Sequence, residues 1–371
     1  MVDIDRNYMR LALREAKKGI GRTSPNPCVG AVVVKNKKLV GKGYHKRAGT
    51  HHAEIHALRE AGKRAKGATL YVTLEPCNHT GRTPPCTEAV LRAGIRRLVI
   101  GMLDPNPGVA GGGAESLASK GVAVSSGILE NECREINLPF IKHATTGLPW
   151  VIMKAGMSID GKIAAGPGQS TRITGEYSLR RVHTLRNQVD AILVGITTAL
   201  VDDPSLTTRL NQPGSGRDPL RVVLDAKLHL PVSSKMLKQQ SSAQTWIFCG
   251  RGADKRKRSK LEEAGAVVKM VPVSRGKLDL KAVLTELGQA QITSVLVEGG
   301  SRVHGSFLQA NLADQILLFV GPVFLGDQGV PLASFSGKKK TSILSQLEII
   351  RTRRYGGDVL IDGHFKHKKS S

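Results

Sequence analysis

The chain has 371 residues, 40% of them hydrophobic, which exceeds the usual size of one domain and suffices for two. Lysine and arginine total 55 against 30 aspartates and glutamates, so the formal net charge is +25. Aromatic residues make up only 4%, which leaves few surfaces for stacking nucleic-acid bases, and we expect this charge to attract small anions instead.

The sequence predicts neither a membrane span nor secretion. It has no apolar run of about twenty residues and no secretory signal. Its five cysteines are too scattered to predict a disulfide framework. We therefore expect a cytoplasmic protein with neither a membrane span nor a nucleic-acid partner.

The first part of the chain alternates helical and extended patterns. An amphipathic helix is predicted from about residue 5 to 18, and one further helix over residues 130–143. Strands are predicted near residues 29–35, 39–44, 69–74, 97–102 and 122–125, with helices between them. This order predicts an α/β/α domain around a mixed sheet.

A short segment with glycine and proline, residues 144–149, predicts a domain boundary. We therefore divide the chain into residues 1–146 and 147–371. Beyond the boundary, strands are predicted near residues 150–155, 190–195, 221–225, 244–249, 294–298 and 315–320. This pattern predicts a second α/β domain.

The most specific motif joins one histidine to two cysteines. The tripeptide HAE at residues 52–54 is followed by Cys77 and, after eight intervening residues, by Cys86. One imidazole and two thiolates can hold three corners of a tetrahedral Zn²⁺ and leave the fourth for water. The pattern predicts a zinc-dependent deaminase of nucleobase-like rings.

Glu54 is the expected proton carrier at this metal. Bound zinc lowers the pKa of its water toward roughly 7, and a nearby carboxylate can pass the proton to a ring nitrogen and to the departing amine. His51 is an alternative ligand, but His52 is favoured because its spacing to Glu54 fits H-x-E. The other three cysteines are expected to be reduced, packed thiols.

Charged residues and glycines at two predicted strand ends indicate a second site. An apolar strand ends in Glu298, Gly299 and Gly300 before a helix. The glycines would let the backbone approach a pyrophosphate, with N–H groups of the helix as donors. Lys154 ends another predicted strand, where it would position a ribose or relay a proton with Glu298; a surface lysine is the alternative.

Three arginines are candidates for binding phosphate. The guanidinium groups of Arg186 and Arg209 match phosphate oxygens, although surface ion pairing is the alternative interpretation. Arg251 is a candidate ligand for the 2′-phosphate of a dinucleotide.

Four stretches of the first half resemble the deaminase half of the bifunctional deaminase and reductase family of riboflavin biosynthesis. They are SPNPCVG at residues 24–30, HAE at 52–54, EPCNHTGRTPPC at 75–86 and DPNP at 104–107. Deaminases of nucleosides and tRNA mostly have two residues between the cysteines, so the longer insertion favours the riboflavin family. The resemblance implies a cytidine-deaminase-like fold, zinc bound by His52, Cys77 and Cys86, proton transfer by Glu54, and substrate contacts from Asn26, His45, Arg82 and Thr83.

Three stretches of the second half resemble the reductase half of the same family, which has a dihydrofolate-reductase-like α/β fold and uses NADPH. They are residues 150–162, 190–204 and 294–306. The resemblance implies cofactor contacts from Gly156, Arg172, Thr198, Asp202, Gly300, Ser301, Arg302, Val303, His304, Gly305 and Ser306. It implies substrate contacts from Ser170, Arg186, Leu206, Arg209 and Glu298. The sequence departs from the family at Arg172, where many relatives have tryptophan, and at Ala226, where several have a serine that could bond the cofactor.

The resemblance implies two successive reactions. Zinc-dependent hydrolysis would deaminate 2,5-diamino-6-(5-phosphoribosylamino)pyrimidin-4(3H)-one, and NADPH would then reduce its ribosyl side chain to ribityl. Members of the family commonly form dimers or tetramers, so a homo-oligomer is expected. Two alternatives stay open: a nucleic-acid base deaminase with a fused accessory domain, and a basic binding module with structural zinc. The latter normally needs four protein ligands, and no fourth is evident.

Overall fold

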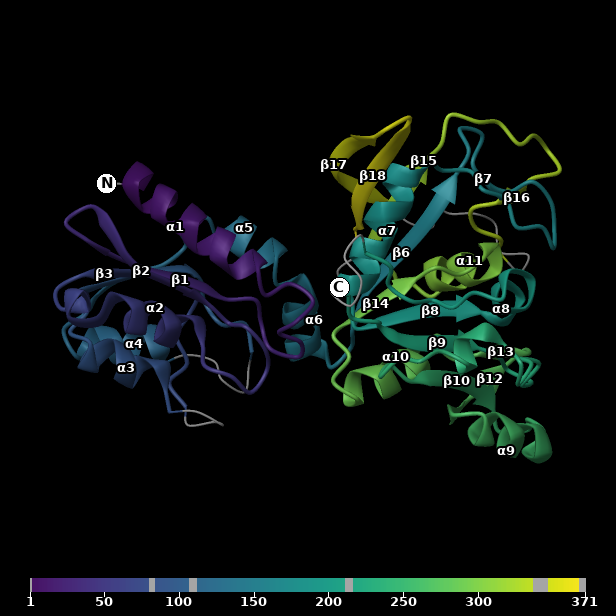
Figure 1. Cartoon of the computed structure of the whole chain (residues 1–371), viewed down its shortest axis with the longest axis horizontal. Helices are drawn as coiled ribbons and strands as arrows, with labels where there is room; N and C mark the ends of the chain where they lie inside the picture. Colours follow the sequence, from purple (N-terminus) through teal and green to yellow (C-terminus); the bar gives the residue numbers. More distant parts are fainter. Residues whose placement is uncertain (1, 80–83, 107–111, 211–215, 336–345, 367–371) are drawn as a thin grey trace. The chain divides into compact units, whose positions relative to one another are not determined.

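The computed structural model describes residues 2–79, 84–106, 112–210, 216–335 and 346–366. The chain divides into two compact units, Met1–Gly147 and Leu148–Ser371, which Figure 1 colours from purple to blue and from teal to yellow. Each unit has its own sheet and its own hydrophobic core. No helix of the described residues is long and apolar enough to cross a bilayer.

The first unit is built on a five-stranded sheet in the order β2-β1-β3-β4-β5. β1 pairs antiparallel with β2 and β3, while β3, β4 and β5 run parallel. Almost every residue of the central strands β1, β3 and β4 is buried, as expected for strands covered on both faces. The strands are β1 (Gly30–Lys35), β2 (Lys38–Tyr44), β3 (Thr69–Leu74), β4 (Arg97–Met102) and β5 (Ala123–Ser125).

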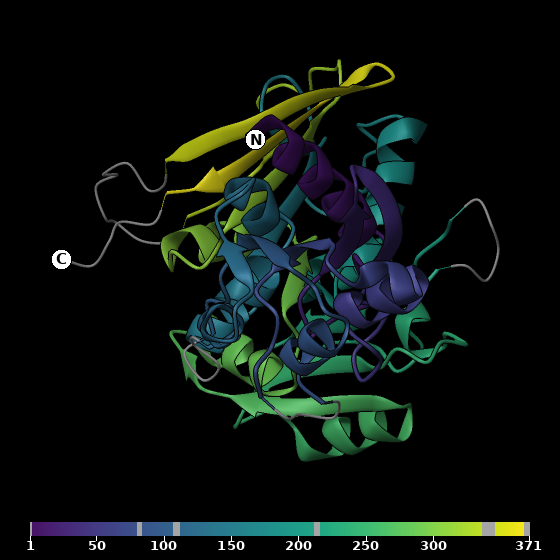
Figure 2. The same ribbon diagram turned by 90° about the vertical axis from the view of Figure 1, so that its left-hand side faces the viewer.

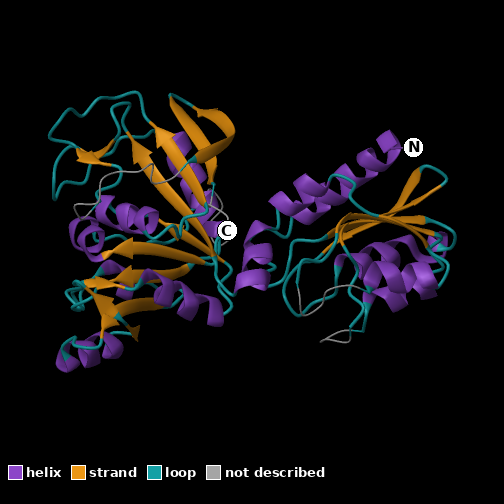
Figure 3. Ribbon diagram, turned by 180° about the vertical axis from the view of Figure 1, so that it is seen from behind, coloured by secondary structure: helices purple, strands orange, loops and turns teal. Residues whose placement is uncertain are grey.

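Helices cover both faces of this sheet, which confirms the predicted α/β/α layering (Figures 1 and 3). One face carries α1 (Val2–Lys17) and α5 (Glu130–Glu135). The other carries α2 (Ala53–Ala61), its continuation η1 (Gly62–Ala65), α3 (Cys86–Arg92) and α4 (Gly113–Ser119). The close approach of α1 requires Gly30, because a Cβ there would clash with the carbonyl oxygen of Ala12.

The single helix predicted over residues 130–143 is wrong. The structure has two helices, α5 and α6 (Leu138–Thr146), separated at Asn137. Pro139 lies in the first turn of α6, where its missing N–H costs no hydrogen bond. The buried Asn137 amide accepts a hydrogen bond from the backbone N–H of Cys28 (2.8 Å) and donates to the carbonyl oxygens of Cys28 (3.1 Å) and Cys133 (3.2 Å). α6 also occupies half of the segment predicted as a link.

The second unit is built on a nine-stranded sheet in the order β11-β10-β9-β8-β14-β6-β15-β18-β17. The strands from β11 through β15 in this order run parallel, and β18 and β17 add an antiparallel edge. The strands are β6 (Trp150–Met157), β8 (Ala191–Gly195), β9 (Leu220–Leu224), β10 (Thr245–Gly250), β11 (Ala266–Val271), β14 (Ser294–Val297), β15 (Gln315–Val320), β17 (Leu347–Tyr355) and β18 (Asp358–Phe365).

Helices pack on both faces of this sheet too. Ala191 and Leu193 of β8 face the core beneath α10 (Leu280–Gln289) and α11 (Ser301–Gln309). Ile192 and Val194 face the core beneath α8 (Ile196–Asp202) and α9 (Lys255–Glu263), and Ile152 and Leu296 face the core beneath α7 (Glu176–Gln188). Short pairs add β7 (Lys162–Ala164) with β16 (Val330–Pro331), and β12 (Val273–Ser274) with β13 (Lys277–Leu278); η2 (Lys235–Leu237) is one 3₁₀ turn. The α/β class predicted for this half is confirmed.

Strands β11, β17 and β18 were missed by the prediction. β17 is an edge strand whose residues are mostly exposed and include three arginines, so it lacks an apolar alternation. The hairpin β17–β18 runs along the edge of the sheet (Figure 2). Its pairing with β15 is a long-range contact that local sequence does not predict.

Candidate active sites

The first site lies in the first unit, where the predicted zinc ligands converge from three elements. His52 directly precedes α2, Cys77 follows β3, and Cys86 begins α3. Nδ1 of His52 lies 3.2 Å from Sγ of Cys86 and 3.5 Å from Sγ of Cys77, and all three ligand atoms lie within 4.8 Å of one another. A tetrahedral zinc with bonds of about 2.0 Å to nitrogen and 2.3 Å to sulfur separates such ligands by about 3.5 Å, so these residues fit the ion.

The surroundings of Cys77 favour its thiolate. Cys86 begins α3, and its N–H donates to Sγ of Cys77 at 3.4 Å. Hydrogen bonds from the Cys86 thiol and from His52 hold the pKa of the Cys77 thiol well below its usual range, although burial opposes them. A thiolate is the form that binds metal.

Glu54 completes this site from the first turn of α2. It is only 3% exposed, and its Oε2 has no hydrogen-bond partner among the described residues. Electrostatic interactions connect it with His52, Cys77 and Cys86, while burial raises the pKa of its carboxyl group. An unpartnered buried oxygen is costly, so its position beside the ligands indicates room for a bound group.

Two of the predicted substrate residues lie next to the ligands. The ring of His45 is 5.3 Å from that of His52, and its Nε2 lies 3.1 Å from the amide nitrogen of Asn26. Burial lowers the pKa of His45, so its neutral ring donates from Nδ1 to the carbonyl oxygen of His51 (3.2 Å) and accepts from Asn26. His51 contributes this carbonyl, and its ring is not part of the ligand cluster. Arg82 and Thr83 lie outside the described residues.

Glu75 supports this site and was not singled out by the prediction. Its carboxylate accepts the backbone N–H of Asp104 at 3.1 Å and that of Ala114 at 2.9 Å. It therefore connects the end of β3, two residues before Cys77, with the segments after β4 and at the start of α4. The sequence did offer a signal for this role, because Glu75 lies between the end of a predicted strand and the predicted metal ligand Cys77.

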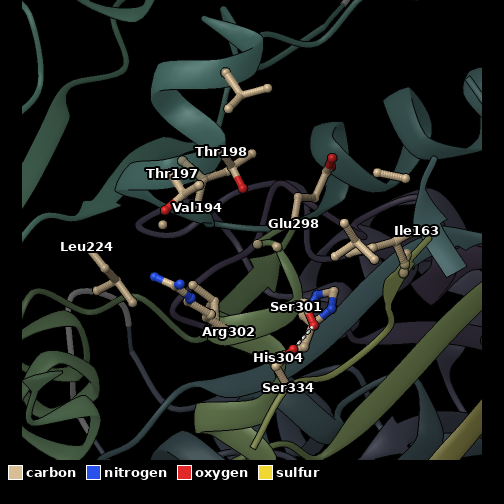
Figure 4. A pocket seen from close by; sticks show the side chains of 18 of the residues that line it. Ile163, Val194, Thr197, Thr198, Leu224, Glu298, Ser301, Arg302, His304 and Ser334 are labelled. Atoms are coloured by element: carbon tan, nitrogen blue, oxygen red, sulfur yellow. Dashed lines mark hydrogen bonds between the residues drawn. The ribbon is translucent and has the colours of Figure 1, made fainter. Parts of the chain in front are cut away.

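The second site is a cavity of about 1570 Å³ within the second unit. It lies at the carboxyl ends of the parallel strands β6, β8, β9 and β14, the usual ligand position in an open α/β sheet. Small-molecule pockets measure roughly 300–1,000 Å³, so this cavity has room for a cofactor together with a substrate. Figure 4 shows part of its lining.

A buried ion cluster lies at one side of this cavity. Both carboxylate oxygens of Glu298 accept from the guanidinium of Arg186 at 2.9 Å, and Nζ of Lys154 lies 3.1 Å from Oε2. Burial alone would raise the pKa of Glu298, but Arg186 and Lys154 hold it well below its usual range. Lys154 does not end a strand as predicted, because β6 continues to Met157. Two cations around one anion leave a net positive charge.

The helix after Glu298 packs closely on the sheet, and this changes the role of Gly299. A Cβ on Gly195 or on Gly299 would lie 2.6 Å from the side chain of Val303. Gly299 was predicted to make room for a pyrophosphate, whereas its missing side chain makes room for Val303. A Cβ on Gly300, the N-cap of α11, would lie 3.2 Å from the hydroxyl of Thr198, so this glycine lies where two elements meet at the cavity.

Most of the predicted cofactor and substrate residues line the cavity. Ser301 hydrogen bonds with Ser334 at 2.7 Å (Figure 4), and burial lowers the pKa of His304 to about 4. The lining includes Lys154, Gly156, Ser170, Arg172, Arg186, Thr198, Asp202, Leu206, Glu298, Gly300, Ser301, Arg302, Val303, His304 and Ser306.

The described lining lacks three of the candidates. A Cβ on Gly305 would clash with the carbonyl oxygen of Ser334, so this glycine serves backbone packing. Arg209 instead contacts His183, with its backbone N–H donating to Nδ1 at 3.1 Å and its Nε lying 3.4 Å from Nε2. Arg251 follows β10 without reaching the cavity wall.

His183 was not predicted, although it lies three residues before Arg186 on α7 and so shares its side of the helix. Burial and the charges of Arg186 and Arg209 lower the pKa of its ring to about 4. Its neutral ring is therefore a support for the segment that carries Arg209.

Together, the fold and the two sites define a zinc-binding deaminase domain followed by a reductase domain. The model for the cytidine and deoxycytidylate deaminase zinc-binding region matches residues 2–102, and the model for the RibD C-terminal domain matches residues 149–361.

Relatives match nearly the whole chain. The riboflavin biosynthesis protein RibD of Aquifex aeolicus is 43% identical over 95% of this chain and 99% of its own length, and that of Escherichia coli is 40% identical over 96% and 98%. The structure of Acinetobacter baumannii RibD superposes with a TM-score of 0.89 at 34% identity, covering 99% of this chain and 100% of its own. A deaminase/reductase from Thermotoga maritima gives a TM-score of 0.86 at 34% identity, covering 98% and 99%.

The chain belongs to the RibD family. It is a bifunctional deaminase and NADPH-dependent reductase of riboflavin biosynthesis.

Proposed function

We propose that residues 1–146 remove ammonia from 2,5-diamino-6-(5-phosphoribosylamino)pyrimidin-4(3H)-one and that residues 147–371 reduce the ribosyl side chain of the product to ribityl. The observation that carries this proposal is the convergence of one imidazole nitrogen and two sulfurs beside the unpartnered carboxylate of Glu54. The Thermotoga maritima relative is a diaminohydroxyphosphoribosylaminopyrimidine deaminase and 5-amino-6-(5-phosphoribosylamino)uracil reductase, which supports the proposed substrate.

In the deaminase domain, His52, Cys77 and Cys86 would hold the zinc. When bound, zinc would lower the pKa of water so that hydroxide is available near neutral pH to attack the ring carbon that bears the amine. Glu54 would pass one proton of that water to the ring nitrogen during the attack, and then the second proton, from the added hydroxyl, to the amine that departs as ammonia. Its raised pKa suits both roles, since a group that must first accept and then donate works best near the ambient pH. Asn26, His45, Arg82 and Thr83 would hold the substrate.

In the reductase domain, NADPH would supply the hydride and lie along α8 and the start of α11, in contact with Gly156, Arg172, Thr198, Asp202 and the residues 300–306. Lys154 and Glu298 would orient the ribosyl group, because their charged ends lie in contact at one side of the cavity. Arg186 fixes the carboxylate of Glu298 by a two-pronged hydrogen bond. Ser170, Leu206 and Arg209 would complete the substrate contacts, with Arg209 acting from outside the described lining.

We also propose that the protein is a cytoplasmic homo-oligomer. Its five cysteines are all described and form no disulfide, as a reducing compartment favours. Sedimentation of the purified protein would measure the assembly.

The proposed function is tested by following ammonia and NADPH absorbance separately in one reaction with the pyrimidine phosphate. We expect ammonia release without NADPH, and NADPH oxidation only after deamination. RNA that contains cytidine and adenosine is the comparison substrate. Deamination of the RNA in preference to the pyrimidine would contradict the proposal and favour a nucleic-acid deaminase.

A further inference from the structure

Four cations line one part of the reductase cavity, and three of them have no role in the proposed function. Arg275 and Lys277 come from the hairpin β12–β13, Lys281 from the start of α10 and Arg302 from the first turn of α11. All four are exposed residues at the cavity. We call Arg275, Lys277 and Lys281 the basic hairpin group.

The turn of the hairpin is tight, which limits where the basic hairpin group can lie. Val273 pairs with Leu278 and Ser274 with Lys277, so Arg275 and Gly276 alone form the connection. Both have positive φ, 50° and 73°, as the two central residues of a type I′ turn do. The hairpin is therefore ordered by its own backbone pairing.

Neighbouring residues place this hairpin beside the ends of β9 and β10. A Cβ on Gly250, the last residue of β10, would lie 2.7 Å from Val273. Gly250 donates its backbone N–H to the carbonyl oxygen of Ala226, which also lines the cavity. Figure 4 shows Arg302 and Leu224 on the side of the cavity opposite Ile163, with Glu298 between them and Ile163. The basic hairpin group thus lies at a different end from the cluster of Lys154, Arg186 and Glu298.

The segment around the hairpin has more basic residues than acidic ones. Asp279 caps α10, and its carboxylate accepts the N–H groups of Lys281 (2.9 Å) and Ala282 (3.2 Å). The segment from Pro272 to Ala282 carries this one acid against three cations. A multiply charged anion would be attracted there.

We propose that the basic hairpin group binds the 2′-phosphate of the adenosine ribose and so selects NADPH over NADH. This inference rests on the proposed function of the cavity as the cofactor site. If the nicotinamide lies near Glu298 and the pyrophosphate at the start of α11, the adenosine end would extend toward Leu224 and the hairpin. The 2′-phosphate is the one group that distinguishes the two cofactors, and arginine and lysine are the residues that bind such phosphates.

The test uses the full-length double variant R275Q/K277Q and titration calorimetry with NADP⁺ and NAD⁺. Losing charge-assisted hydrogen bonds should raise the Kd for NADP⁺ by about 10-fold to 100-fold. The Kd for NAD⁺ should change less than about twofold, because NAD⁺ lacks the phosphate. The matched control is K255Q/R256Q on α9, which removes the same charge outside the described lining and should leave both constants unchanged.

Two results would overturn the inference. Equal weakening of NADP⁺ and NAD⁺ would mean that the hairpin attracts any anion, and unchanged binding of NADP⁺ would mean that the phosphate lies elsewhere. Both results leave the proposed function intact as long as the unaltered protein binds NADP⁺. Failure of the unaltered protein to bind either nucleotide would instead overturn the proposed function together with this inference.

Discussion

The two sites of this chain are built in different ways. The deaminase site consists of three ligand atoms within 4.8 Å and one buried acid, all supplied by residues 52–86. The reductase cavity of about 1570 Å³ gathers its lining from residues 154–334, at the ends of four strands. A metal site depends on a few atoms at fixed spacing, whereas a dinucleotide site depends on the sheet that brings distant loops together. A single substitution should therefore remove most of the activity of the first site, whereas it should remove a smaller part of the activity of the second.

The largest effect is expected for Glu54→Gln. The amide cannot carry the proton, so ammonia release should fall by about 10²-fold to 10⁴-fold. Zinc content, measured by atomic absorption, should stay at the level of the unaltered protein, because His52, Cys77 and Cys86 are untouched. Reduction of the deaminated pyrimidine, supplied directly, should be unchanged.

A suitable control for this substitution is Glu115→Gln, which alters an exposed acid on α4. It should release ammonia at the normal rate. Loss of zinc from Glu54→Gln, or full ammonia release by it, would show that the carboxylate has a structural role instead.

A smaller effect is expected for Glu298→Gln in the reductase cavity. The amide leaves Arg186 and Lys154 without their anion, and we expect the rate of NADPH oxidation to fall by at least about tenfold, since one charge-assisted contact is worth about that much. Ammonia release should not change. Glu263→Gln, which alters an exposed acid on α9 outside the described lining, is the control. A parallel loss of both activities would contradict the separation of the two sites.

The free energy of unfolding of the reductase domain should depend on pH, because burial lowers the pKa of His304 to about 4. The folded state then binds fewer protons than the unfolded state, whose histidine titrates near 6.5. The stabilising contribution is complete above about pH 6.5 and is lost as the pH falls toward 4. Glu298, with its lowered pKa, adds nothing to this window, because it is ionised in both states above its ordinary value of 4.5.

The measurement is urea unfolding followed by tryptophan fluorescence, since the only two tryptophans, Trp150 and Trp246, belong to the second unit. The free energy of unfolding should decline from pH 6.5 to 4.5. His304→Gln should flatten this decline, although a slope from His183, whose pKa is also lowered to about 4, should remain. An identical slope in the variant would refute the role of His304.

The two sites also differ in how far the sequence alone predicts them. His52, Glu54, Cys77 and Cys86 were found from spacing, because a metal constrains residue types within a short stretch. The role of Gly299 and the position of Arg209 were not, because the first depends on how closely α11 packs Val303 on the sheet and the second on His183 of α7. The strand pattern predicted an α/β domain for the second half, while the edge hairpin β17–β18 depends on pairing with β15 that its exposed, charged residues do not indicate.

The smallest effect is expected for Asp254→Ala at the N-cap of α9, outside the described lining of the reductase cavity. The Asp254 carboxylate caps this helix by accepting the N–H groups of Arg256 (2.7 Å) and Lys257 (3.0 Å). Losing the cap should lower the free energy of unfolding by about 1 kcal/mol, because two N–H groups of the first turn lose their partner. Asp254→Asn keeps an acceptor and should lose less. The fluorescence of Trp246 in β10 reports the change, and both catalytic rates should be normal. Reduced NADPH oxidation in Asp254→Ala alone would mean that the reductase cavity depends on α9. Residues beyond the described lining would then also contribute to the rate of reduction.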